Sequence, residues 1–208
     1  MEDPAIQEAT ASEPLTLEEE YENQQSWRDS HDKLTFILCQ PTKAEEGKVN
    51  AGQCDSPDRM IGDINFFLYP WDDDADEKQQ TINPEKAQYV GEIDVMVADT
   101  SQRGKGIGKA AVDAFMHYIC CNLHPILQEH HGVTGKPRLR KFMVKIKADN
   151  RASIALFKGV GFKQDGDVDY FGEIKMVLDD FGSFATKVVP EFRELIYCRP
   201  SAQGKSTQ

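Results

Sequence analysis

The pattern of apolar and polar residues changes sharply near the middle of the chain. Residues 89–98 alternate between apolar and polar side chains and are rich in β-branched residues, which predicts a strand. Residues 107–122 carry apolar side chains at helical spacing, which predicts a helix. Between them, three glycines stand at every second position: Gly104, Gly106 and Gly108. The sequence therefore predicts a strand, a glycine-rich turn and a helix.

The glycine-rich turn has the properties of a phosphate site. Glycine lacks a Cβ atom, so the backbone can turn sharply there and a ligand can come close. The free amides at the start of the following helix point outward with the positive end of the helix dipole. These features predict a cradle for a pyrophosphate.

Two common phosphate-binding motifs do not fit this turn. A P-loop is excluded because Arg103 stands where its first glycine should be and Ala110 replaces the hydroxyl that holds magnesium. A dinucleotide-binding fingerprint fits on spacing, but eight residues separate Val97 from Gly106. That fold places its first glycine directly after the strand.

The turn instead resembles the loop of the GNAT acetyltransferases, in which Arg or Gln is followed by two residues, Gly, one residue, and Gly or Ala. Arg103, Gly106 and Gly108 match that pattern in full. Residues 141–162 resemble the second GNAT motif: a strand, then Asn150 at the start of a helix, then an ending of the form aromatic-x-x-x-Gly-Phe. On these two motifs the chain is identified as a member of the GNAT superfamily.

A finer resemblance, to the N-acetyltransferase 9-like branch, covers residues 3–178. It rests on residues 11–21, 60–68 and 91–99. Members of that branch carry a first strand and most of a first helix ahead of the segment that begins here at Asp3. Either the start codon is assigned too late, or the chain folds with one edge strand and part of the acceptor-side wall missing.

The resemblance implies an α/β GNAT fold. Its central sheet is mixed, mostly antiparallel and splayed between the fourth and fifth strands, with helices on both faces. We expect an N-terminal remnant (1–11), an acetyltransferase domain (12–178) and a C-terminal tail (179–208).

Local signals predict several further elements. Thr16 and Glu19 have the spacing of a capping box and predict a helix start. The other expectations are a strand at 33–40, surface loops at 41–59 and 70–88, a long loop at 123–140, a final strand at 171–178 and a short helix at 190–197.

Composition excludes several classes of function. The net charge of −11 and the pI near 4.9 argue against a nucleic-acid partner and favour amines or basic peptides. No apolar run approaches the roughly 18 residues of a membrane span, and the first ten residues lack a signal-peptide pattern. The five cysteines show no metal-binding spacing, so we expect free thiols, no metal and a cytoplasmic protein.

The resemblance also implies which residues bind acetyl-CoA. The pantetheine arm would pair with the end of the fourth strand, the amides of the loop would hold the pyrophosphate, and Arg103 and Lys105 would add positive charge. For Lys105 and Lys109, solvated charges beside a helix start are the alternative. The cofactor-binding residues expected on this basis are Val95, Met96, Val97, Arg103, Gly104, Lys105, Gly106, Ile107, Gly108, Lys109, Asn150 and Phe157.

Acetyl transfer to an amine needs a general base, because amines are mostly protonated at neutral pH. Glu92 and Asp94 lie on one face of the predicted fourth strand and are the candidates; the alternative is that they face solvent or pair with Lys147. Many GNATs use a Tyr of the second motif as general acid, but here Phe157 stands there, so Tyr170 is the candidate.

Three functions remain open from the sequence. The first is an acetyl-CoA-dependent N-acetyltransferase, an acyltransferase that acts on a protein or peptide amine. The second is a GNAT-fold scaffold protein that works through contacts, for example with cytoskeletal partners. The third is a small-molecule amine acetyltransferase.

Overall fold

The computed structural model describes residues 14–41, 47–71, 87–132, 135–189 and 192–199. The predicted remnant 1–11 and the end of the tail from residue 200 lie outside the described residues.

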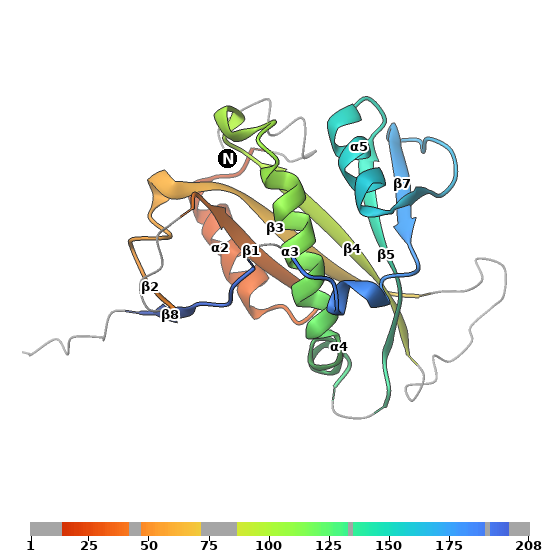
Figure 1. The fold of residues 1–208 in the computed structure, drawn as a ribbon, viewed down its shortest axis with the longest axis horizontal. Coiled ribbons are helices and arrows are strands. Elements are labelled where there is room, and N and C mark those ends of the chain that lie inside the picture. The colour runs from red at the N-terminus through yellow and green to blue at the C-terminus, as the bar shows by residue number, and fades with distance from the viewer. Residues whose placement is uncertain (1–13, 42–46, 72–86, 133–134, 190–191, 200–208) are drawn as a thin grey trace, which may run out of the picture.

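A six-stranded mixed sheet forms the centre of the molecule, in the order β1-β3-β4-β5-β7-β6 (Figure 1). The β4–β5 pair is parallel and every other neighbouring pair in this sheet is antiparallel. This confirms the predicted mixed, mostly antiparallel sheet. The strands are β1 (Lys33–Cys39), β3 (Met60–Pro70), β4 (Gln88–Val97), β5 (Arg138–Lys147), β6 (Lys163–Gln164) and β7 (Glu173–Leu178).

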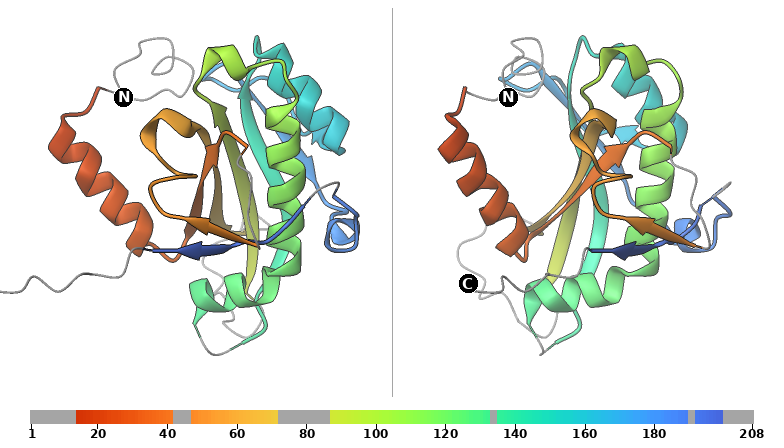
Figure 2. Two further views of the ribbon diagram at one scale, coloured as in Figure 1. Left: turned by 60° about the vertical axis from the view of Figure 1, so that its left-hand side comes forward. Right: turned by 90° about the vertical axis from the view of Figure 1, so that its left-hand side faces the viewer.

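Helices lie on both faces of the sheet, as predicted. Helices α3 (Ile107–Cys121) and α5 (Arg151–Val160) lie on one side, and α2 (Leu17–Asp29) lies on the other (Figure 2). Helix α4 (Leu123–His131) continues from the end of α3. Short 3-10 turns add η1 (Pro57–Arg59), η3 (Thr100–Gln102) and η4 (Gly182–Ala185).

The hydrophobic core fills the space between the sheet and the α3 side. Because side chains alternate along a strand, every second residue of β3, β5 and β7 points into this layer. Phe66 of β3 and Phe142 of β5 meet there above the intervening strand β4, with ring centroids 5.8 Å apart. The largest fully buried side chains are Phe66, Phe142, Ile64, Met116, Ile119, Met176, Val112 and Val144.

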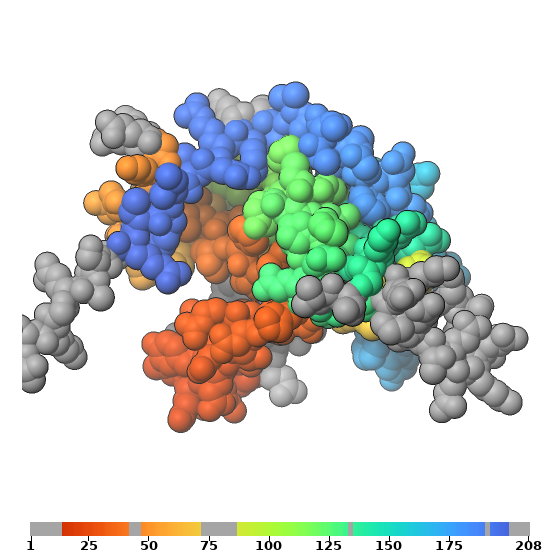
Figure 3. All heavy atoms as spheres, turned by 90° about the horizontal axis from the view of Figure 1, so that it is seen from below, coloured from red at the N-terminus to blue at the C-terminus, as the bar shows by residue number. Residues whose placement is uncertain are grey.

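Helix α2 packs differently from the other helices. It contains no buried residue, and Leu17, Tyr21 and Trp27 remain exposed. Figure 3 shows α2 standing apart from the body of the molecule over much of its length. It begins as predicted, with Thr16 and Glu19 forming a capping box.

Three predicted segments differ from the structure. The predicted loop 123–140 contains α4, whose Leu123 and Leu127 lie at helical spacing; Pro125 stands in its first turn, where no amide is needed. The predicted loop 41–59 contains strand β2 (Lys48–Asn50). The predicted helix 190–197 is wrong for its described part, because Ile196–Cys198 forms strand β8 parallel to β2.

Candidate active site

The sheet opens between β4 and β5, as the predicted fold requires. The two strands pair only from Gln88 to Glu92 on β4 and from Arg138 to Met143 on β5. Beyond this point, no pairing joins residues 93–97 to residues 144–147 in the described structure. The second halves of the two strands therefore separate, and one edge of β4 is left open.

The open edge of β4 presents main-chain groups of alternate residues. The N–H of Ala98 donates to Ile61 O at 2.8 Å and so faces β3. Because successive residues point their main-chain groups to opposite edges, those of Val97 and Val95 face the gap. Met96 pairs with Asp63, and its main chain turns toward β3. Val95 and Val97 thus lie where the sequence placed them, whereas Met96 can contribute only its side chain.

The glycine-rich turn forms an open nest of main-chain donors. Gly104 and Gly106 have φ values of +75° and +83°, a conformation that favours glycine, and a Cβ at either would meet no atom within 4 Å. Helix α3 has no side-chain cap. The N–H groups from Gly104 to Lys109 donate no hydrogen bond to another described residue. Open space and unpaired donors at a helix start fit a diphosphate.

Gly108 serves a different purpose from the other two glycines. It is helical, and a Cβ there would lie 3.1 Å from Leu156 Cδ1 of α5. This position lets α3 and α5 approach each other at the opening between β4 and β5. Ile107 lies beside it at the start of α3 and is half-buried.

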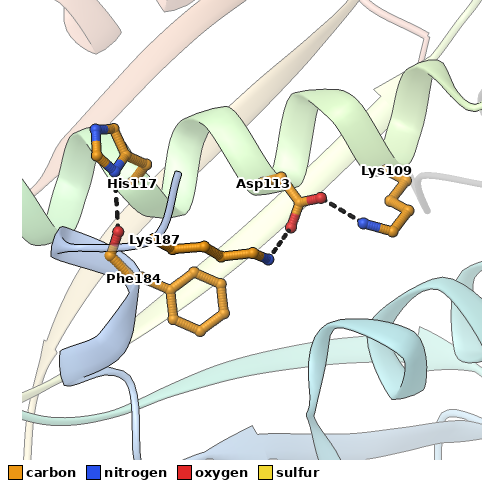
Figure 4. Close-up of polar contacts among 5 residues, drawn as sticks. All are labelled: Lys109, Asp113, His117, Phe184 and Lys187. Carbon is orange, nitrogen blue, oxygen red and sulfur yellow. Dashed lines mark hydrogen bonds and ion pairs between the residues drawn. The ribbon is translucent and has the colours of Figure 1, made fainter. Parts of the chain in front are cut away.

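The predicted cations near the turn already have partners within the protein. Arg103 Nε donates to Val97 O at 2.8 Å, and Lys105 Nζ donates to Gln102 Oε1 at 3.2 Å. Lys109 forms an ion pair with Asp113 one turn further along α3 (Figure 4). Each cation already makes a contact within the protein, and each keeps further N–H donors that could reach a phosphate.

Asn150 and Phe157 have structural contacts in α5. Asn150 is exposed, and its Oδ1 accepts a hydrogen bond from Ser153 N–H at 3.1 Å, so it caps the helix. The side chain of Phe157 is buried against Phe162, with ring centroids 5.2 Å apart. Both side chains thus have partners within the segment 150–162.

Carboxylates gather on the sheet face that lies opposite α3. Glu92 and Asp94 share this face, as expected from their spacing. Strand β3 adds Asp63, which is diagonal to Asp94 because Asn65 pairs with Asp94. Glu92 forms an ion pair with Lys145 at 3.2 Å, and not with Lys147.

The environment of this face raises the pKa of two carboxylates. Burial and the nearby charge of Asp94 raise the pKa of Asp63 to about 6. A hydrogen bond from Asn65 Nδ2 at 3.0 Å acts in the opposite direction but is outweighed. Burial also raises the pKa of Asp94. A pKa of about 6 suits Asp63 to accept a proton near neutral pH.

Asp63 is the site residue that sequence reasoning missed. The segment 60–68 shows a single carboxylate within an apolar strand, which is the signal that could have found it. Its importance depends on the β3–β4 register, which places it opposite Met96 and next to Asp94. That register is not visible in local spacing.

Tyr170 is 96% exposed and lies in the turn between β6 and β7. Its ring packs edge-on against Phe171 at 5.5 Å between centroids. No contact between Tyr170 and the carboxylates of the sheet is found among the described residues. The structure does not bring the predicted base and acid together.

The described residues contain no group of three or more His, Cys, Asp or Glu side chains that could hold a metal ion. None of their helices has the length and apolar character needed to span a membrane.

Comparisons with known proteins agree with this geometry. Residues 1–163 match the family model for the acetyltransferase (GNAT) domain. The chain is 35% identical over 191 residues to an N-acetyltransferase 9-like protein of Schizosaccharomyces pombe, covering 86% of this chain and 84% of the relative. It is 36% identical over 173 residues to the human protein named alpha/beta-tubulin-N-acetyltransferase 9, covering 83% and 68%.

A solved structure shares the fold at low sequence identity. It is an aminoglycoside acetyltransferase in complex with coenzyme A, with a TM-score of 0.53 and 18% identity. The match covers 89% of this chain and 88% of that protein.

Proposed function

Because the chain belongs to the GNAT acetyltransferase family and is an acyltransferase, we propose that it transfers the acetyl group of acetyl-CoA to an amine of a protein or peptide. The observation that carries this proposal is the position of Asp94 at the opening between β4 and β5, with Asp63 next to it on the neighbouring strand β3. The same opening ends at the glycine-rich turn, which presents unpaired amides.

Acetyl-CoA would supply an activated acetyl thioester. The amides of residues 104–109 would bind its diphosphate, and the open edge at Val95 and Val97 would bind the pantetheine arm. These contacts hold the reacting groups in place, and proximity of this kind is a large source of rate enhancement. A main-chain N–H at the open edge of β4 would also donate a hydrogen bond to the thioester carbonyl oxygen as that oxygen gains negative charge.

The proton of the acceptor amine is proposed to leave through Asp63. α-Amines have a pKa of about 8 and lysines about 10.4, so a base near neutral pH is needed. With a pKa of about 6, Asp63 is ionised at pH 7 yet close enough to that pH to exchange protons. Asp94 is the second candidate, whereas Glu92 is held in an ion pair with Lys145.

Two observations support a protein acceptor. Relatives from human and fly are named for acetylating α/β-tubulin. The net charge of −11 and the carboxylates on the open sheet face favour a cationic amine on a polypeptide over an acidic acceptor. We therefore propose a protein amine of the cytoskeletal class as acceptor.

The experiment is acetylation of a peptide library, measured as a function of pH for the wild type and Asp63→Asn. In the wild type, kcat should rise with pH through about 6 as Asp63 ionises. Asp63→Asn should lose this inflection and lower kcat by about 10²- to 10³-fold. The control Asp165→Asn removes a carboxylate that is paired with Lys175, and it should keep the inflection.

Protein stability separates catalysis from misfolding in this experiment. The folded-state pKa of Asp63 is raised, so its contribution to stability is present at low pH and is lost as pH rises through about 6. Asp63→Asn should therefore not lower Tm at pH 7.5. An Asp63→Asn enzyme with unchanged kcat and an unchanged inflection would refute Asp63 as the base. A wild type that binds acetyl-CoA but acetylates no peptide would refute the proposed acceptor class.

A further inference from the structure

A charged cluster links the C-terminal part of the chain to the first turn of α3. Asp113 accepts from Lys109 of the same helix and from Lys187, whose Nζ lies 2.9 Å from Asp113 Oδ1 (Figure 4). Lys187 lies 74 residues away in sequence, after η4. One carboxylate thus faces two ammonium groups beside the glycine-rich turn.

Several contacts hold Lys187 in this position. Phe184 is buried, and its carbonyl oxygen lies 2.9 Å from His117 Nδ1 of α3. The main-chain N–H of Lys187 donates to Ser183 O at 2.8 Å. The Lys187 ammonium also lies 5.1 Å from the centroid of the Phe184 ring. The segment around η4 therefore places Lys187 against α3 independently of the ion pair.

Asp113 is ionised at neutral pH, and its charge is more than matched. Its side chain is only 14% exposed. Burial acts to raise the pKa of Asp113, but hydrogen bonds and charge from Lys109 and Lys187 outweigh burial and hold that pKa below its usual range. The cluster of three carries one surplus positive charge.

Lys109 occupies a position that is unfavourable for a cation within the free helix. It lies in the first turn of α3, at the positive end of the dipole, and this turn contains no acidic residue. The order of Lys109 before Asp113 is also the weaker order for an ion pair four residues apart. An anion bound at the turn would make this position favourable for the Lys109 ammonium.

We propose that Lys109 pairs with Asp113 in the free protein and moves to the diphosphate of acetyl-CoA when the cofactor binds. Lys187 makes this exchange possible because it remains as the partner of Asp113. This inference rests on the proposed use of acetyl-CoA. Without Lys187, transfer of Lys109 to the diphosphate would leave the poorly exposed Asp113 unpaired, which is costly. Lys187, which lies in the C-terminal segment, is thus a positioning residue for cofactor binding.

The test is titration calorimetry with coenzyme A at low salt, about 20 mM, where charges are weakly screened. Lys187→Met should weaken binding by about three- to tenfold, and Lys187→Arg should bind as the wild type does. Lys163→Met, at an exposed lysine on β6, is the control for the loss of one positive charge and should change the Kd less than Lys187→Met does.

The double variant Asp113→Asn/Lys187→Met decides the mechanism. In the Asp113→Asn background Lys109 has no ion pair to break. Removal of Lys187 should then raise the Kd of coenzyme A no more than the Lys163→Met control does. An equal loss from Lys187→Met in both backgrounds would show a general charge effect and overturn the inference, as would an unchanged Kd for Lys187→Met alone. Failure of the wild type to bind coenzyme A would instead refute the proposed function.

Discussion

Helices α2 and α3 begin in opposite ways. At the start of α2, the Thr16 side chain accepts from the Glu19 N–H, and Glu19 Oε2 accepts from the Thr16 N–H at 2.8 Å. Its first turn contains three glutamates. At the start of α3, Gly106 provides no side chain, no residue of the first turn is acidic, and Lys109 adds positive charge.

The difference shows where the chain satisfies its own helix ends and where it does not. The exposed α2 has its free donors and its dipole satisfied by its own sequence. The better packed α3 could obtain the same stabilisation from one Ser, Asp or Glu, yet it has none. We infer that the donors of α3 are kept for an external anion, which the proposed function identifies as the diphosphate of acetyl-CoA.

The largest effect is expected from filling the open end of α3. Gly106→Glu places a side chain at φ +83° and a negative charge among the free amides. Affinity for coenzyme A, measured by calorimetry, should fall by at least about 100-fold, or about 2.7 kcal/mol.

A matched control exists at Gly166, which has φ +87° and also has open space where a Cβ would lie. Gly166→Glu carries the same strain and the same charge at another turn, and should leave the Kd of coenzyme A within about twofold. Equal losses in the two variants would show that the Gly106 result reflects strain alone.

A smaller effect is expected from giving α3 an acidic first turn like that of α2. Ala110 is exposed, so Ala110→Glu fits without repacking. The helix dipole should raise the free energy of unfolding by about 0.3 kcal/mol, while the Kd of coenzyme A should rise by about threefold to tenfold. Ala110→Gln is the neutral control. Tighter binding in Ala110→Glu would contradict an anion site.

A third helix start, at Asn150 of α5, sharpens the comparison. Because Asn150 Oδ1 caps the Ser153 N–H, Asn150→Ala should lower the free energy of unfolding by about 1 kcal/mol in urea titrations. Asn150→Ser should retain most of that stability. If Asn150 also binds the pantetheine arm, as the sequence suggested, both variants will weaken coenzyme A binding; unchanged affinity in both will assign Asn150 to capping alone.

The smallest effect is expected at the start of α2. Thr16→Ala removes the cap of a helix that buries no residue, so it should cost about 0.5 kcal/mol or less globally and increase amide exchange locally. Coenzyme A affinity should not change. A large loss of affinity would mean that α2 contributes to the cofactor site.

The sequence predicted best those features that depend on neighbours in the chain. The turn at Gly104 and Gly106, the capping box at Thr16 and the helix start at Asn150 each follow from local spacing, and the structure confirms all of them. The family resemblance predicted the separation of β4 and β5, which no local pattern shows.

Features that depend on distant contacts were not predicted. The position of Asp63 next to Asp94 requires the β3–β4 register. The contact of Lys187 with Asp113 requires the C-terminal segment to pack on α3. Local periodicity favours a helix over the residues of strand β8, because its partner, β2, lies about 150 residues earlier and such pairing leaves no trace in local periodicity.

The most direct test of the central claim is a coenzyme A titration followed by ¹H–¹⁵N amide shifts. If the turn holds the diphosphate, the largest shifts will come from the amides of residues 104–109, with smaller changes at Val95 and Val97. The amides of residues 17–20 at the start of α2 should not move. Binding that shifts other amides and leaves residues 104–109 unchanged would contradict the account.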